Sequence, residues 1–155
     1  MASDEDRRNA VTYPAITLWQ PWATWIADGL KVIETRTHAR FRCLVGHRIA
    51  IHAGRRWDDT AIRAAMWVSP VGWWAQLKQS AQRARSVRGM VVCTATVRDF
   101  QVLHEGHSPA ALINCRGTHR YGLFLQDVRP VVPPVPARGH QGIWQWNPQG
   151  QEIVK

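Results

Sequence analysis

Three charged side chains lie close together in one short stretch of the sequence: Lys31, Glu34 and Arg36. A buried lysine loses its proton readily and can then act as a base or nucleophile. A glutamate can accept a hydrogen bond from the exocyclic amine of a base, and an arginine can bind phosphate through two donors. The three residues are therefore candidates for a site that binds a phosphate or a base edge, with Lys31 and Glu34 as catalytic candidates. A strand surface covered by salt bridges is the alternative.

Tryptophans surround this stretch on its N-terminal side. Three of them, Trp19, Trp22 and Trp25, are expected to pack in the core rather than to stack on bases, because aromatic residues at helical spacing usually pack. Of the three, Trp19 lies at a strand-to-helix corner and is the best candidate for stacking on a base, because single-strand binders combine aromatic rings with positive charge.

Basic residues in the following segments are further candidates for binding nucleic acid. They are Arg40 and Arg42 in a loop, and Arg55 and Arg56 beside Trp57. His52 is expected on the outward face of a strand, where it could transfer protons near neutral pH. The alternatives are a solvated loop and an ordinary surface histidine.

No cofactor or metal is expected from the remaining motifs. His104, His107, Cys115 and His119 do not have the spacing of a closed zinc site. The sequence also contains no glycine-rich phosphate loop and no serine nucleophile elbow.

The elements that position these residues can be predicted from periodicity and from turn residues. Strands are expected at 13–19, 31–35, 48–53, 90–97, 121–128 and 142–146, and helices at 21–28, from about 54 through 67, and at 73–87. In the second strand, alternation would place Val32, Glu34 and Arg36 on one face. Lys31 could instead belong to the preceding turn and approach Glu34. Residues 99–117 read as a loop, and residues 130–136 as a proline-rich connector unable to pair in a central strand.

The overall charge points to a polyanionic partner. The 155 residues carry a net charge of +9, and seventeen of the twenty basic residues are arginine. Such an excess is typical of nucleic-acid-binding proteins, although a preference for arginine codons is an alternative. Three cysteines without paired spacing, no secretory leader and no membrane-spanning run together predict a cytoplasmic protein.

The segment Leu18-Trp-Gln-Pro-Trp-Ala23, followed by Gly29-x-Lys31-x-x-Glu34-x-Arg36, resembles the signature of the ASCH (activating signal cointegrator homology) domain family. Residues 49–53, 90–97 and 142–146 resemble later strands of that family in type and order. The resemblance implies an α+β, PUA-like small mixed β-barrel of about six strands with flanking and inserted helices. It would cover residues 13–147, between flexible tails at 1–12 and 148–155.

The family resemblance also implies a function. Members are expected to bind RNA or modified nucleosides in a cleft beside the first helix. Some small members resemble amidohydrolases that remove an acyl group from N4 of cytidine, using a lysine and a threonine of the motif, and others are described as ribonucleases. Lys31 matches that lysine, whereas Glu34 occupies the position of the threonine.

We therefore expect a protein that binds single-stranded or modified RNA, or a nucleoside, with DNA as an alternative ligand. A hydrolase using Lys31 as base is the second hypothesis, and a protein-interaction module is the third.

Overall fold

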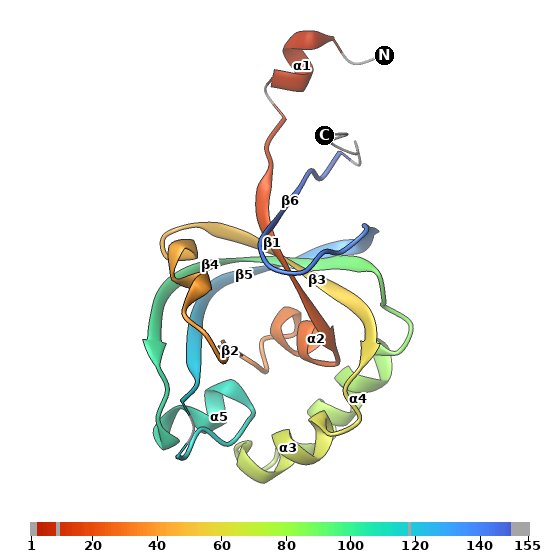
Figure 1. The fold of residues 1–155 in the computed structure, drawn as a ribbon. Coiled ribbons are helices and arrows are strands. Elements are labelled where there is room, and N and C mark those ends of the chain that lie inside the picture. The colour runs from red at the N-terminus through yellow and green to blue at the C-terminus, as the bar shows by residue number, and fades with distance from the viewer. Residues whose placement is uncertain (1–2, 9, 118, 150–155) are drawn as a thin grey trace.

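Six strands form one mixed sheet in the computed structural model, which describes residues 3–8, 10–117 and 119–149 (Figure 1). Neighbouring strands follow the order β2-β5-β4-β3-β1-β6, and β1 and β3 pair in parallel while the other pairs are antiparallel. The strands are β1 (Tyr13–Gln20), β2 (Ile33–Arg36), β3 (Arg48–Trp57), β4 (Met90–Val102), β5 (Tyr121–Pro136) and β6 (Trp144–Trp146). The helices are α1 (Asp4–Arg8), α2 (Trp22–Ala27), η1 (Arg40–Leu44), α3 (Ala61–Val68), α4 (Trp74–Ala84), η2 (Glu105–His107) and α5 (Ser108–Ala111).

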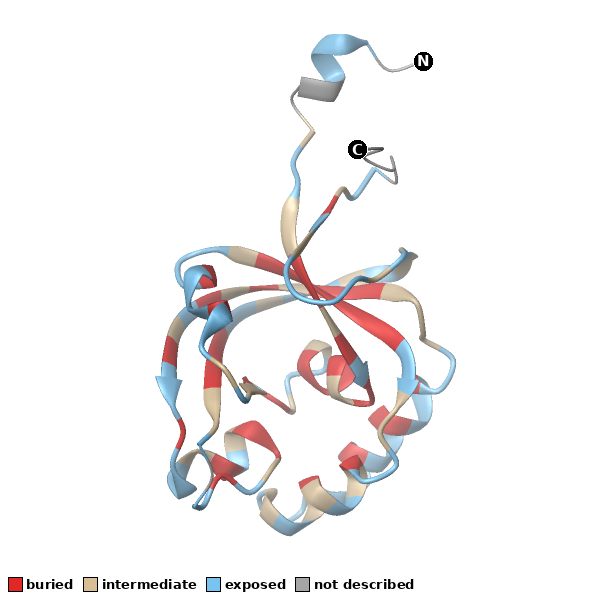
Figure 2. Ribbon diagram, viewed as in Figure 1, coloured by how far each residue is buried: buried red, intermediate tan, exposed pale blue. Residues whose placement is uncertain are grey.

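The sheet curves around α2, which lies in its concavity (Figure 1). Ala23 and Ile26 of α2 are fully buried against inward-facing residues of the strands, including Ile16 and Ile51. Figure 2 shows buried segments along the sheet and on the helices that close the concavity. The expected mixed α+β fold is therefore confirmed. The edge strands β2 and β6 do not pair with each other among the described residues, so closure into a barrel is not observed.

Gln20 fixes the start of α2. Its buried side-chain Oε1 accepts a hydrogen bond from the backbone N–H of Thr24 at 3.0 Å, which satisfies a donor in the first helical turn. Its Nε2 donates to Thr24 Oγ1 and to the carbonyl of Val87, both at 2.7 Å. The glutamine thereby joins the β1–α2 corner to the segment that follows α4.

Several predicted boundaries were wrong. β3 continues to Trp57, so the helix expected from residue 54 begins at Ala61. The predicted loop 99–117 includes the end of β4, η2 and α5. The proline-rich segment pairs with β4, as in the register of Pro136 with Met90. It can do so because β2 covers β5 only at residues 121–124, which leaves the prolines at an edge.

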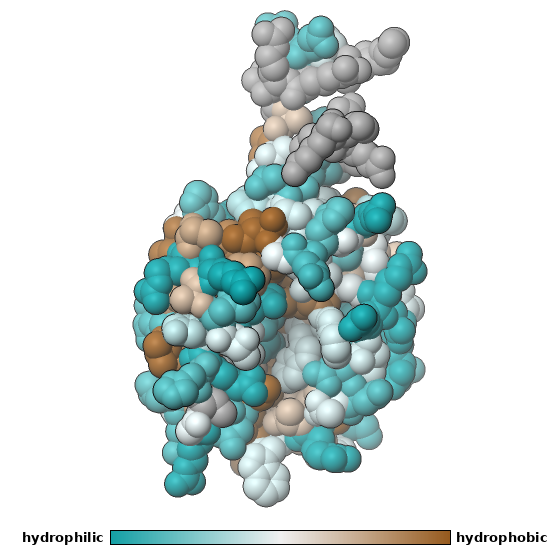
Figure 3. Space-filling model, viewed as in Figure 1, coloured by the Kyte–Doolittle hydropathy of each residue, from teal (hydrophilic) through white to brown (hydrophobic). Residues whose placement is uncertain are grey.

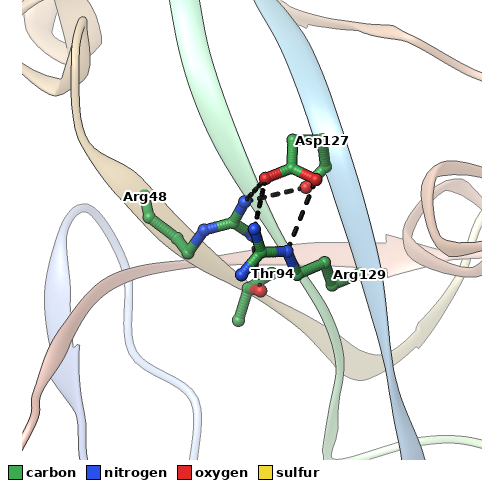
Figure 4. A network of polar contacts seen from close by, with 4 residues as sticks. All are labelled: Arg48, Thr94, Asp127 and Arg129. Carbon is green, nitrogen blue, oxygen red and sulfur yellow. Dashed lines mark hydrogen bonds and ion pairs between the residues drawn. The ribbon is translucent and has the colours of Figure 1, made fainter.

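The outer surface of the sheet holds a polar network that joins β3, β4 and β5 (Figure 4). Arg48 donates to Thr94 Oγ1 at 2.8 Å and to the carbonyl and the carboxylate of Asp127. Arg129 donates to the same carboxylate. The positive charge of Arg48 is therefore compensated within the fold.

The two ends of the chain differ in what the structure describes. The predicted N-terminal tail contains α1, which has three acidic residues in its first turn and lies apart from the sheet (Figure 1). Of the predicted C-terminal tail, residues 150–155 lie outside the described residues. No helix among the described residues is long and apolar enough to cross a membrane.

Candidate functional site

A cavity of about 270 Å³ lies where β1 ends and β2 begins. On the face seen in Figure 3, a furrow runs between two largely hydrophilic sides. The cavity residues come from six parts of the chain: the end of β1, α2, the α2–β2 turn, β2, the β3–α3 connection and the α5–β5 connection. They are Thr17, Leu18, Trp19, Trp22, Lys31, Glu34, Thr35, Arg36, Asp58, Ile113 and Arg120.

Lys31 and Glu34 both line this cavity. β2 begins at Ile33, so Lys31 belongs to the turn before the strand, as one of the two alternatives predicted. The expected strict alternation fails, because Lys31, Glu34, Thr35 and Arg36 all reach the cavity while Val32 is exposed. A short edge strand that starts after Lys31 does not impose a pleated pattern on the preceding residues.

Lys31 is a buried cation, with a side chain that is 1% exposed. Its Nζ donates to the carbonyl of Ala111 and lies 4.9 Å from the centre of the Trp22 ring. Burial lowers the pKa of Lys31, and the negative charge of Glu34 opposes this effect. A lysine in this environment gives up its proton more easily than a solvated lysine.

Three residues that line the cavity each have a buried polar atom with no hydrogen-bond partner among the described residues. These atoms are Glu34 Oε2, Arg36 Nε and Arg120 Nε. The other oxygen of Glu34 accepts from the backbone N–H of Thr35 at 2.8 Å. Leaving such groups unpaired costs about 1–3 kcal/mol each. The residues of the cavity wall thus contain one acceptor and two donors that have no partner among the described residues.

Aromatic rings form part of the cavity wall. Trp19 is 48% exposed, and the Arg56 guanidinium lies 5.4 Å from the centre of its ring. Trp22 is half-buried and donates through Nε1 to Asp58 Oδ2 at 2.8 Å. Trp25 is fully buried in the core, as expected. The structure therefore leaves Trp19 as the ring that is accessible for stacking.

Asp58 supplies a negative charge to the cavity wall. Burial would raise its pKa, but hydrogen bonds from Thr60 and Trp22 outweigh this and lower the pKa below its usual 3.8. An anionic group of a ligand would consequently favour the side of the cavity that carries Arg36 and Arg120.

The remaining predicted residues lie elsewhere. His52, Arg55 and Arg56 line a second, larger groove that meets the first cavity at Thr17 and Trp19. His52 contacts Thr17, Ala137 and Trp144 rather than the core cluster that contains Ile49 and Ile51, as alternation predicts. It is nevertheless 2% exposed because residues 137–139 cover it, so the expectation of a surface histidine was wrong. Arg40 and Arg42 lie on η1 and line neither space.

Some cavity residues were missed in the sequence analysis. Ile113 lies in the predicted loop 99–117 and Arg120 follows it, and neither was a candidate for the site. Asp58 was not a candidate either, and its hydrogen bond to Trp22 joins segments 36 positions apart. No local pattern in the sequence indicates that these three residues meet Lys31. The described residues contain no cluster of three or more His, Cys, Asp or Glu side chains that could hold a metal ion.

The arrangement suits a planar polar ligand of nucleoside size. A base could stack against Trp19, give an N–H to Glu34 Oε2, and place carbonyl or phosphate oxygens near the two arginines. A buried lysine beside these groups could in addition remove a proton.

Comparisons with known proteins agree with this fold. The model of the ASCH domain family matches residues 16–121. A crystal structure of ASCH from Zymomonas mobilis is similar with a TM-score of 0.53 and 16% identity, covering 88% of each chain. A mutant of that protein from the same organism has 19% identity and a TM-score of 0.48, covering 79% of this chain and 72% of the other. At these identities the similarity to the solved structures concerns the fold.

Proposed function

The chain belongs to the ASCH domain family, and from this premise we propose that it binds an unpaired or modified nucleotide of RNA in the cavity beside α2. Glu34 accepts a hydrogen bond from an amine of the base, Trp19 stacks on its face, and Arg36 and Arg120 bind phosphate or carbonyl oxygens. The observation that carries the proposal is Glu34 Oε2, a buried carboxylate oxygen without a hydrogen-bond partner among the described residues, on a side chain that lines the cavity together with Arg36 and Arg120.

The chemistry of this atom narrows the ligand. A buried carboxylate oxygen needs a donor, and the Watson–Crick edges of cytosine, adenine and guanine each provide an N–H from an exocyclic amine. Uracil has no exocyclic amine and can donate to this oxygen only through its ring N3–H. Because a base within a duplex has its edge occupied, an unpaired base is the form that the cavity can bind.

A hydrolase acting on the same ligand is the second candidate, and Lys31 favours it. Burial lowers the pKa of Lys31, and the residue shares the cavity with Glu34, so a neutral amine could act as general base at an amide or a ribose hydroxyl. The family resemblance implies N4-acylcytidine amidohydrolases or ribonucleases. Glu34 replaces the threonine of the amidohydrolase motif, which makes binding the first candidate and hydrolysis the second.

One experiment tests both candidates. A labelled single-stranded RNA containing one N4-acetylcytidine, and the same RNA with unmodified cytidine, are titrated with wild-type protein and with Glu34→Gln. The substitution keeps the shape of the side chain and removes its charge. We expect affinity for at least one RNA to fall about 10-fold or more, since hydrogen bonds to charged groups are worth about 1.5–3 kcal/mol.

The control is Arg63→Ala, at an exposed position of α3 that lines neither the cavity nor the neighbouring groove. Equal affinities for wild type and Glu34→Gln would contradict the proposed cavity. Mass spectrometry of the same mixtures tests the second candidate, hydrolysis. Wild-type protein would be a hydrolase if it removes the acetyl group or cleaves the RNA chain and the Lys31→Met variant does neither.

A further inference from the structure

A second groove, with a volume of about 1140 Å³, lies next to the proposed nucleotide cavity. The two share Thr17 and Trp19, so the exposed Trp19 ring stands at their junction. The groove is formed by the end of β3 on one side and by residues 136–147 on the other, including the segment that leads from β5 to β6. The family motif around Lys31 includes none of the residues that line this groove, apart from Trp19.

The groove has the charge of a polyanion site. Three arginines line it, Arg55, Arg56 and Arg138, and each is exposed. His140 adds a fourth basic side chain. Among the described residues that line the groove, none carries a carboxylate. A surface of this kind attracts phosphates and has no acidic side chain in its wall to repel them.

Aromatic rings accompany this charge. Trp144 lies within the groove, Trp19 lies at its junction with the cavity, and Arg56 stacks over Trp19. Alternating rings and guanidinium groups are what proteins use to follow a single strand, because every base has a face that can stack.

A series of hydrogen bonds centred on His52 holds the wall of the groove in place before any ligand binds. Trp144 Nε1 donates to Thr17 Oγ1 at 3.1 Å, and the Thr17 hydroxyl lies 3.2 Å from His52 Nδ1. His52 Nε2 lies 2.8 Å from the carbonyl of Ala137 and therefore carries the proton as donor, which leaves Nδ1 to accept from Thr17. All four groups are satisfied without a ligand, so His52 acts as a positioning residue.

Gly139 allows the segment after β5 to lie close to His52 and Thr17. A Cβ atom at this position would lie 2.5 Å from His52 Cε1 and 2.7 Å from Thr17 Oγ1. The segment that presents Arg138 and His140 is thereby held against β1 and β3, and ligand binding does not have to order it.

We propose that this groove binds the nucleotides that flank the one in the cavity, so that the ligand is a single-stranded polynucleotide that crosses the Trp19 junction. The inference rests on the proposed function of the cavity and extends it. A nucleoside or mononucleotide would fill the cavity alone and leave the three groove arginines unused.

The test compares ligands of different length on one protein. Cytidine 5′-monophosphate and single-stranded RNAs of three, five and seven nucleotides, each with one central cytidine among uridines, are titrated with the full chain. Wild type should bind the seven-nucleotide RNA at least 10-fold more tightly than the mononucleotide. A DNA of the same sequence shows whether the 2′-hydroxyls contribute.

The groove variant is Arg55→Gln combined with Arg138→Gln, and its matched control is Arg63→Gln, with thermal unfolding to confirm that each folds. We expect the groove variant to lose about 10-fold or more in affinity for the seven-nucleotide RNA and to bind the mononucleotide within about twofold of wild type. The dependence of log affinity on log salt should become shallower by about 1.4, since each phosphate contact on a single strand contributes about 0.7.

The outcomes separate the two proposals. If the groove variant binds the long RNA like the Arg63→Gln control, the groove proposal is wrong, whatever Glu34→Gln does. If the groove variant weakens the long RNA while Glu34→Gln changes neither ligand, the cavity proposal fails and the groove is a polynucleotide site in its own right. If all lengths bind equally, the ligand is a mononucleotide and the groove proposal is overturned.

Discussion

Lys31 carries a positive charge in the unfolded chain at neutral pH, but the fold places its ammonium group away from water. The carbonyl of Ala111, the Trp22 ring and the charge of Glu34 compensate part of the lost hydration. The pKa is nevertheless lowered, which means that the protonated form is less favourable in the folded state than in the unfolded state. A buried lysine with a lowered pKa in a cavity is a candidate for a functional role, because it does not stabilise the fold.

Replacing this lysine should therefore stabilise the fold. We expect Lys31→Met to raise the free energy of unfolding at pH 7 by about 1–2 kcal/mol, because an apolar side chain of similar length avoids the desolvation of a charge. Between the lowered folded pKa and the unfolded value of 10.5, the unfolded wild-type chain holds more protons, so wild-type stability rises with pH. The advantage of the variant should shrink over this range.

Urea unfolding at pH 7, 8 and 9 measures both effects. Lys78→Met, at an exposed position of α4, is the control and should change stability by less than about 0.5 kcal/mol. A Lys31→Met protein that is less stable than wild type at pH 7 would mean that the contacts of the ammonium outweigh its burial.

The residues of the site were predictable where they share one local motif. The turn at Gly29 brings Lys31 into reach of Glu34, and both alternatives for Lys31 could be stated from the sequence. Arg120 and Asp58 could not be predicted, because their places in the cavity depend on how α5 and the β3–α3 connection pack against α2. Such contacts depend on tertiary packing, which leaves no periodic pattern in the sequence.

At the level of the elements, β3 and the segment 137–144 depend on each other through His52. The expectation of a surface His52 followed from strand alternation and from the neighbouring basic residues. It failed because the chain after β5 returns to cover this face of β3, with Ala137 and Gly139 against the imidazole ring. The end of β3 could not be predicted either, because Arg55 and Arg56 resemble loop residues. In the structure, Gly54 lets the strand continue close to β1.

This arrangement predicts a dependence of stability on pH. Burial lowers the pKa of His52 below 6.5, and the nearby charges of His140 and Arg55 act in the same direction, while the bond to Ala137 opposes them. As the pH falls through 6.5, the unfolded chain binds a proton that the folded chain binds less well, so stability is lost. Above pH 6.5 this contribution to stability is fully present.

We expect His52→Gln to unfold with a shallower dependence on pH between 7.5 and 5 than wild type. The pKa of His107 is also lowered by burial, so the comparison with wild type is needed to isolate His52. Guanidinium or urea unfolding at several pH values measures the difference. Parallel curves for the two proteins would show that His52 titrates normally in the folded state.

For the molecule as a whole, the net charge of +9 is a sum over arginines with different surroundings. Arg48 is engaged with Asp127 on the outer face of the sheet, and Arg83 is paired with Asp28 between α4 and α2. Arg55, Arg56 and Arg138 have no carboxylate among the described residues that line the groove. Total charge predicts a polyanionic partner, whereas the fold determines which arginines are available to bind one.

This difference can be measured as the salt dependence of binding to single-stranded RNA. Arg138→Gln removes an exposed groove arginine and should make the slope of log affinity against log salt shallower by about 0.7. Arg48→Gln removes the same charge from the chain and should leave the slope unchanged, because its guanidinium is already neutralised by Asp127 (Figure 4). It should instead lower the free energy of unfolding by about 1 kcal/mol.

Equal effects of the two substitutions on the slope would mean that RNA responds only to net charge and that binding is not confined to the groove. No salt dependence in any of the proteins would favour the third hypothesis, a protein-interaction module, since a site that neutralises phosphates must release counterions.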